Sequence, residues 1–272
     1  MATQAEKADK FKALHEGDGA FVIPNPWDPG SARLLAALGY EALATTSSGF
    51  ANSIGRADGA VSLEEKLAHC RALCAATDLP VSADLEKCFA DTPEGVAATI
   101  RSAAETGVVG ASIEDFSGDP ERPIYDFELA VERVHAAVEA ARSFEFQFML
   151  TARAENLLRG RNDLDDTIRR LQAFEQAGAD VLYAPALKTL EQVRTVVGAL
   201  RKPVNVLAPP MKNVTVAELS DAGVKRISIG GALARAVIAT LLHAGREMRD
   251  QGTFAWTSDA TPGSEINRML GG

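Results

Sequence analysis

Short apolar runs alternate with longer amphipathic stretches along almost the whole chain. Eight of the apolar runs have the length of a buried strand, and they lie at 20–25, 41–46, 80–84, 108–114, 145–151, 180–184, 203–207 and 225–229. They are continuous runs, which is typical of parallel strands that are buried on both faces. A stretch with helical spacing of apolar positions follows each run, so the pattern predicts eight strand–helix units.

Helix-start signals and unit length support this interpretation. Three Ser or Thr residues are followed three positions later by Glu or Gln, at 62–65, 189–192 and 215–218. This is the spacing of a capping box, in which each residue satisfies a free backbone N–H of the other. Eight units in 272 residues average about 34 residues each, the size of a βα repeat. We therefore predict one domain over 1–272, an α/β (β/α)8 TIM barrel with an extra C-terminal helical segment at 250–272.

Composition and charge narrow the classes of function. The chain has 28 Lys and Arg against 37 Asp and Glu, a net charge of −9. Nucleic acid attracts surplus cations, so nucleic acid is not expected as a partner. No window approaches the ~18 apolar residues of a membrane span, and the first residues contain no apolar secretory segment. Three cysteines do not make a disulfide framework. We expect a cytoplasmic protein that has no membrane partner.

Three acidic side chains are expected at one end of the predicted barrel. In this fold the chemistry lies at the carboxyl ends of the strands, where the sequence places Asp84, Glu86 and Glu114. Asp84 and Glu86 are two positions apart, so both point to one face of an extended chain. Converging carboxylates repel each other unless a cation neutralises them, and oxygen donors alone favour Mg²⁺ or Mn²⁺. The same spacing equally fits strand-end caps or ion-pair partners of Arg153.

Arg153 and a segment of small residues are candidates for binding an anion. An arginine fork can hold a carboxylate with two parallel hydrogen bonds, or it can pair internally with Glu155 or Glu114. The small residues at 46–49 follow a predicted strand, so their backbone N–H groups can approach an oxyanion; alone, such a segment is more often a turn. The four histidines fall outside the strand ends, which weakens any mechanism that needs a histidine base.

A set of motifs in this chain resembles the isocitrate lyase/phosphoenolpyruvate mutase superfamily. The motifs lie between about 18 and 250 and read PNPWD, SARLL, GY, ATTSSG, VSADLE, SIED, TARAENLLRG and NVLA. The resemblance implies a (β/α)8 barrel with a Mg²⁺-dependent site for a small 2-oxo or 2-hydroxy carboxylate. It implies that a C–C or P–C bond beside the carbonyl is made or broken. It also implies a last helix exchanged between subunits, so 250–272 is expected to pack on a neighbour in a homodimer or homotetramer.

The resemblance also implies roles for individual residues. Asp84 corresponds to the direct metal ligand, and three further acids of the metal site act mostly through water: Asp58, Glu86 and Glu114. The substrate carboxylate corresponds to the loop Ser47, Ser48 and Gly49 together with Arg153, and the pocket is lined by Trp27 and Asn205. The residues expected to take part in catalysis are Arg153, Glu114 and Asp58.

Two departures from the superfamily pattern bear on the reaction. Glu86 stands where the family has a second aspartate, and the stretch 116–123 lacks the Cys and His of the lyase loop. Isocitrate or 2-methylisocitrate cleavage is therefore disfavoured. We expect a Mg²⁺-dependent lyase that cleaves a C–C bond next to the carbonyl of an oxaloacetate-like acid through a metal-stabilised enolate. The alternatives are a phosphonopyruvate-type P–C mutase or hydrolase, a non-catalytic carboxylate-binding barrel, and a Schiff-base aldolase that uses Lys188.

Overall fold

The eight predicted strands are present and form one parallel sheet in a computed structural model that describes residues 2–271. The strands are β1 (Phe21–Ile23), β2 (Leu43–Ala44), β3 (Val81–Asp84), β4 (Gly110–Glu114), β5 (Met149–Arg153), β6 (Val181–Tyr183), β7 (Val204–Leu207) and β8 (Arg226–Ser228). Their order in the sheet is β1-β8-β7-β6-β5-β4-β3-β2, and every pair is parallel. The Ala44 N–H donates to the Pro24 carbonyl at 3.0 Å, which nearly closes the ring between β1 and β2. The predicted (β/α)8 barrel is confirmed.

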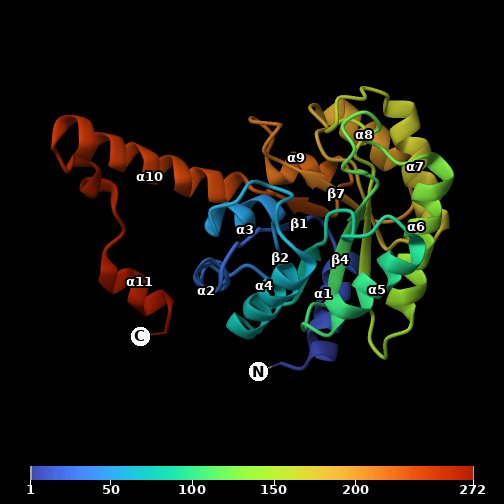
Figure 1. Ribbon diagram of the computed structural model, residues 1–272, viewed down its shortest axis with the longest axis horizontal. Coiled ribbons are helices and arrows are strands. Elements are labelled where there is room, and N and C mark those ends of the chain that lie inside the picture. Colours follow the sequence, from blue (N-terminus) through green and yellow to red (C-terminus); the bar gives the residue numbers. More distant parts are fainter. Residues whose placement is uncertain (1, 272) are drawn as a thin grey trace.

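Helices between the strands cover the outside of this barrel (Figure 1). The helices are α1 (Gln4–Glu16), α2 (Pro29–Ala37), α3 (Ser47–Ser53), α4 (Leu63–Ala76), α5 (Pro93–Ala104), α6 (Phe127–Arg142), α7 (Leu164–Gln176), α8 (Leu190–Gly198), α9 (Val216–Asp221), α10 (Ala232–Gln251), the 3₁₀ helix η1 (Ala255–Asp259) and α11 (Gly263–Met269). Capping boxes at Ser62 and Thr215 begin α4 and α9 as predicted, whereas Thr189 accepts the Gln192 N–H in a one-sided cap of α8.

The interior of the barrel is apolar at one end and polar at the other. Phe11 of α1 packs with Ile23, Val109, Met149 and Val181, so α1 closes the amino-terminal end with an apolar layer. Towards the carboxyl end the strand positions that face the cavity become polar, as the alternation of side chains along a strand allows. These positions are Ser82, Asp84, Ser112, Arg153, Tyr183, Asn205, Arg226 and Ser228. The strands are therefore buried on both faces but are not apolar on both.

Several elements differ from the prediction in extent or type. The residues before the first predicted strand form α1, which begins with a capping box between Thr3 and Glu6. The segment expected as a turn at 47–49 is instead the first turn of α3, because the Thr46 side chain caps it. Strand β5 begins at Met149 rather than 145, because Phe144, Phe146 and Phe148 stack against one another before the strand begins.

The carboxyl-terminal part of the chain leaves the barrel. Figure 1 shows α10 extending away from the strands and the following chain turning back towards α2, which α11 contacts. Arg33 of α2 donates a hydrogen bond to the Leu270 carbonyl. Several large apolar side chains on α10 remain exposed, among them Leu241 at 69%. Among residues 2–271, no helix is both long enough and apolar enough to cross a membrane.

Candidate active site at the carboxyl end of the barrel

The register of β3, β4 and β5 brings the main predicted polar residues together. Glu114 of β4 lies opposite Arg153 of β5, and Asp84 of β3 lies opposite Ser112 of β4. All of them face the carboxyl end of the strands. An open cavity of about 820 Å³ lies there, and Asp84, Glu114 and Arg153 line it together with Asp58 and other residues. The structure therefore brings Asp58, Asp84, Glu114 and Arg153 together at the mouth of the barrel.

Arg153 forms ion pairs with three carboxylates. Its Nη1 lies 3.1 Å from Asp84 Oδ1, and its Nη2 lies 2.9 Å from Glu114 Oε2 and 2.8 Å from Glu155 Oε1. Arg159 adds a second cation, with Nη2 at 3.3 Å from Glu155 Oε2 and 3.8 Å from Glu114 Oε1. Of the two interpretations left open by the sequence, internal ion pairing is the arrangement found in this structure. Arg153 also lines the cavity, which leaves it accessible to a bound anion.

The pKa values of Glu114 and Asp84 are shifted in opposite directions, because burial and the nearby cations balance differently at the two acids. Burial raises the pKa of Glu114 well above its usual range, and the charge of Arg153 only partly offsets this. Burial also acts to raise the pKa of Asp84, but the nearby charges of Arg153 and Lys66 outweigh it, so its pKa lies below the usual value. Asp84 therefore remains ionised at neutral pH.

Glu86 and Asp58 carry negative charge without a cation partner. Among residues 2–271 neither carboxylate forms a hydrogen bond or an ion pair, and both line the open cavity. Burial, the charge of Asp84 and the charge of Asp58 raise the pKa of Glu86 to about 7. Glu86 lies in a loop with positive φ angles at Glu86 (52°), Cys88 (59°) and Phe89 (52°), a conformation that costs free energy for residues other than glycine.

These acids fit a hard divalent cation in chemistry and charge. The donors are oxygen atoms only, and the unpaired charge at Glu86 and Asp58 adjoins Asp84. No three His, Cys, Asp or Glu side chains in the described part of the chain are arranged as a ready-made metal site. Arg153 instead neutralises part of the negative charge of Asp84 and Glu114. The residues are thus suited to Mg²⁺ by their donor set and by the charge around Glu86.

The residues predicted to bind the substrate carboxylate form the start of α3. The Ser47 N–H donates to Asp84 Oδ2 at 3.1 Å, and the Gly49 N–H donates to Thr46 Oγ1 at 3.3 Å. Ser47 and Ser48 line the open cavity, while Gly49 is buried behind them. A Cβ at Gly49 would lie 2.5 Å from Thr46 Cγ2, so only glycine fits at this position. Two of the three backbone donors are therefore already engaged within the protein.

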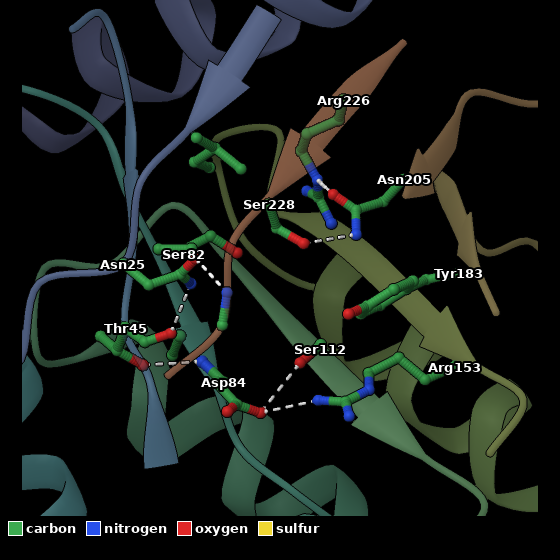
Figure 2. A pocket seen from close by; sticks show the side chains of 14 residues that line it. Asn25, Thr45, Ser82, Asp84, Ser112, Arg153, Tyr183, Asn205, Arg226 and Ser228 are labelled. Carbon is green, nitrogen blue, oxygen red and sulfur yellow. Dashed lines mark hydrogen bonds and ion pairs between the residues drawn. The ribbon is translucent and has the colours of Figure 1, made fainter. Parts of the chain in front are cut away.

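Trp27 and Asn205 lie apart from the open cavity. Trp27 lines neither of the two cavities at this end of the barrel, and its carbonyl pairs with His69 Nε2 at 2.9 Å. Asn205 lines a smaller cavity of about 60 Å³ beneath the open one. Figure 2 shows it between Arg226, whose Nε donates to its Oδ1 at 2.8 Å, and Ser228, whose Oγ accepts from its Nδ2 at 3.0 Å.

Several residues of the site were not anticipated from the sequence. Tyr183 lines both cavities, and the buried Arg226 lines the smaller one. Arg226 and Ser228 are polar residues two positions apart in β8, a spacing that marks an inward face, whereas Tyr183 is the only polar residue of β6. Lys66 of α4 is 1% exposed, and its Nζ donates to Thr45 Oγ1 at 3.0 Å. Its helical position gave no sign that the side chain reaches the acids, because that depends on how α4 packs against β2 and β3.

Comparisons with known proteins agree with this geometry. The family model described as phosphoenolpyruvate phosphomutase matches residues 11–249. A solved structure from Burkholderia cenocepacia J2315, provisionally assigned as a lyase or mutase, is 53% identical; the match covers 99% of this chain and 97% of that one, with a TM-score of 0.96.

Two curated relatives have assigned activities. The 2-methylisocitrate lyase of Escherichia coli K12 is 29% identical over 89% of this chain and 84% of that protein. The oxaloacetate decarboxylase of Paraburkholderia xenovorans LB400 is 27% identical over 96% of this chain and 87% of that protein. Both relatives match over most of their length, so the similarity includes the strands and loops that carry the acids and Arg153.

Proposed function

Because this chain belongs to the phosphoenolpyruvate phosphomutase family, within the isocitrate lyase/phosphoenolpyruvate mutase superfamily, we propose that it is a Mg²⁺-dependent carbon–carbon lyase. Its substrate is a small 2-oxo or 2-hydroxy acid of the oxaloacetate type, cleaved at the bond next to the carbonyl. The observation that carries the proposal is the meeting of Asp84, Glu86, Glu114 and Arg153 around one open cavity at the carboxyl end of the barrel.

The acids and Arg153 at the mouth of the barrel have different roles in the proposed reaction. Asp84, Glu86, Glu114 and Asp58 would hold Mg²⁺, directly or through water, and the bound ion would supply a Lewis acid for charge that develops on the carbonyl oxygen as an enolate forms. Arg153 binds a carboxylate of the substrate through its planar guanidinium.

The backbone of α3 and the walls of the cavity complete the site. Ser47 holds Asp84 through its N–H, and Ser48 faces the substrate. Gly49 lets α3 pack closely against Ala234 of α10 and Trp27. The cavity is lined on the opposite side by Leu207 and Pro209, which limit the access of water to the reacting atoms.

The relatives support both carbon–carbon and carbon–phosphorus chemistry. One curated relative is named 2-methylisocitrate lyase and another oxaloacetate decarboxylase, while the family model is that of a phosphomutase. The stretch 116–123 lacks the Cys and His expected of the 2-methylisocitrate type, which favours the oxaloacetate type. A P–C bond mutase or hydrolase that acts on a phosphonopyruvate-like acid is the second candidate, and its substrate would present the same 2-oxo carboxylate to Arg153.

A candidate of another class is a barrel that binds a carboxylate without reaction. The ion pairs of Arg153 with Asp84, Glu114 and Glu155 favour it, because they saturate the groups that an enzyme would present to its substrate. The two candidates differ in turnover: both predict Mg²⁺-dependent binding of oxalate, an enolate mimic, but only the lyase predicts product.

The test is a panel of 2-oxo diacids, 2-hydroxy diacids and phosphonates, with Mg²⁺ and with a chelator. We expect turnover of an oxaloacetate-like diacid that is lost with the chelator and in Asp84→Asn. The exposed Asp9 of α1 provides the matched control, and Asp9→Asn should retain full activity. Undiminished turnover in the chelator, or full activity of Asp84→Asn, would refute the proposal. Oxalate binding without turnover of any panel compound would support the non-catalytic candidate.

The exposed face of α10 supports assembly into a homodimer or homotetramer. Val237, Leu241 and Leu242 are 51%, 69% and 48% exposed on a helix that extends away from its own barrel (Figure 1). Large apolar side chains clustered in this way are typical of a subunit interface. We include packing of 250–272 on a neighbouring subunit in the proposal, and sedimentation of the full chain tests it.

A further inference from the structure

The proposed reaction needs an acid that protonates the carbon left after bond cleavage. The residues at the position of the lyase loop do not supply one. The stretch 116–123 contains no Cys or His. None of the four histidines lines either cavity at the mouth, and the buried Cys88 lines neither of them. Asp84 and Glu114 are engaged with Arg153, and the proposed function assigns Glu86 to the cation.

Tyr183 has the position that such an acid requires. It ends β6 directly between Arg153 of β5 and Asn205 of β7, with which it is in register. Its side chain is 8% exposed and lines both the open cavity and the smaller cavity beneath it. Figure 2 shows its hydroxyl pointing into the space enclosed by Asp84, Arg153 and Ser228. The phenol is therefore at the floor of the site that a substrate held by Arg153 would enter.

A chain of hydrogen bonds inside the barrel orders the polar groups beside this hydroxyl. Arg226 Nε donates to Asn205 Oδ1 at 2.8 Å, and Asn205 Nδ2 donates to Ser228 Oγ at 3.0 Å. The Ser228 hydroxyl in turn donates to the Val206 carbonyl at 3.4 Å, and Ser228 lines the smaller cavity together with Tyr183. Arg226 is 5% exposed and has no carboxylate partner among residues 2–271; its Nη2 donates to Thr151 Oγ1 at 2.8 Å. This buried cation fixes the amide of Asn205 with its NH₂ group towards Ser228.

From this arrangement we infer that Tyr183 is the general acid of the proposed lyase. For an oxaloacetate-like substrate, the C3–C4 bond breaks, CO₂ leaves, and the electron pair remains on the enolate of the 2-oxo acid product. The phenolic O–H bond of Tyr183 then breaks and its proton forms a C–H bond at C3. The tyrosinate regains a proton from water, so the cycle consumes one solvent proton and releases CO₂ and the keto acid.

The surroundings suit both protonation states of Tyr183. Burial raises the pKa of Tyr183 to about 12, so the phenol holds its proton at neutral pH before the reaction. After transfer, the charge of Arg153, whose Cζ lies 5.1 Å from the ring centroid, stabilises the tyrosinate. The general acid is thus kept neutral by burial and is supported as an anion by Arg153.

The test compares Tyr183→Phe with the wild-type enzyme and with Tyr40→Phe, a control on the turn before β2. This inference rests on the proposed function, so two readouts are used: turnover of an oxaloacetate-like diacid, and Mg²⁺-dependent exchange of the pyruvate methyl protons with D₂O, followed by NMR. Exchange runs the protonation step backwards and does not require C–C cleavage. We expect Tyr183→Phe to lose about 10²–10⁴-fold in kcat and to lose exchange. Its Kd for oxalate should stay within twofold of wild type.

The outcomes separate the two hypotheses. Suppose that the wild-type protein turns over the substrate, and that the kcat and the exchange rate of Tyr183→Phe stay within threefold of wild type. This result would overturn the role of Tyr183 and leave the proposed lyase activity intact. Wild-type protein with neither turnover nor exchange would overturn the lyase and this role with it. If Tyr183→Phe does not fold, replacement of the three tyrosines by the more acidic 3-fluorotyrosine tests the same role. The basic limb of the kcat profile should then move to lower pH, and an unmoved limb would refute it.

Discussion

Removing the guanidinium of Arg153 is the perturbation whose effect the structure specifies most fully. Arg153→Met keeps the apolar stem and deletes the cation that Asp84, Glu114 and Glu155 share. At N–O distances of 2.8–3.1 Å and an effective dielectric constant of about 20, each pair attracts by roughly 5–6 kcal/mol. Much of that attraction offsets the cost of desolvation. Deleting one partner of a buried ion pair costs about 3–5 kcal/mol in measured cases.

Because Arg159 still pairs with two of the acids, we expect the loss of stability in Arg153→Met to lie at the lower end of this range of about 3–5 kcal/mol. The Arg159 Nη2 remains 3.3 Å from Glu155 and 3.8 Å from Glu114 after the substitution. We therefore expect Arg153→Met to lower the free energy of unfolding by about 3 kcal/mol at pH 7.5. Urea unfolding followed by circular dichroism measures this, with the exposed Arg71→Met of α4 as the matched control. Arg71→Met should stay within about 0.5 kcal/mol of wild type.

The pH dependence of the stability lost in Arg153→Met shows whether the loss is electrostatic. Without Arg153, the pKa of Glu114 rises further above that of the unfolded chain and the pKa of Asp84 rises from its lowered value, so the folded variant binds more protons. The destabilisation is then complete above the raised pKa values and is relieved as the pH falls through them. We expect a smaller loss at pH 5 than at pH 7.5, and partial rescue by 10 mM Mg²⁺ at the higher pH. A loss below 1 kcal/mol, or one equal at both pH values, would refute this account.

Three further perturbations follow from single contacts. His15 is 4% exposed and burial lowers its pKa to about 3, so between pH 6 and 4 the unfolded chain binds a proton at this residue and the folded chain does not. In urea titrations His15→Phe should therefore reduce the loss of stability over this range by up to about 1.4 kcal/mol per pH unit. An unchanged slope of stability against pH would contradict this. Gly49→Ala should lower the free energy of unfolding by about 1–3 kcal/mol and weaken oxalate binding, because the added Cβ would clash with Thr46. The control Gly198→Ala adds its Cβ in open space. Equal losses of stability in the two variants would count against the clash. Leu241→Glu should shift the full chain to smaller species in sedimentation, unless α10 lies outside the interface.

The barrel could be predicted because its signals are local and repeated. Each strand is a short apolar run, and cap residues such as Ser62 and Thr215 mark where helices begin. The same spacing between Thr3 and Glu6 begins α1, which the strand–helix pattern does not include because its first apolar run starts at residue 20. The limits of the strands were less predictable, because aromatic packing before Met149, rather than local preference, decides where β5 begins.

The site was predictable as a set of residues but not as a set of contacts. Spacing alone placed Asp84, Glu114 and Arg153 at one end of the barrel, since strand ends meet there whatever their partners are. Both interpretations of Arg153 used these same residues, so the sequence could not choose between them. The spacing of Arg226 and Ser228 marks the inward face of β8, whereas the inward orientation of Tyr183 depends on the register of β6, which no local pattern fixes.

At the mouth of the barrel the acidic side chains near β5 are paired with arginines, whereas two acids near β3 are not. This difference favours one orientation of a bound anion. Around β5, Arg153 and Arg159 neutralise Glu114 and Glu155. Around β3, Glu86 and Asp58 have no cation partner in the described chain, and the raised pKa of Glu86 reflects burial together with that surplus negative charge. A divalent ion is therefore attracted to the β3 side, whereas an anionic substrate is repelled there and attracted to the arginines. In the proposed function, a 2-oxo acid whose carboxylate is held by Arg153 would have its carbonyl between the two sides, within reach both of a cation held by the β3 acids and of the phenol on β6.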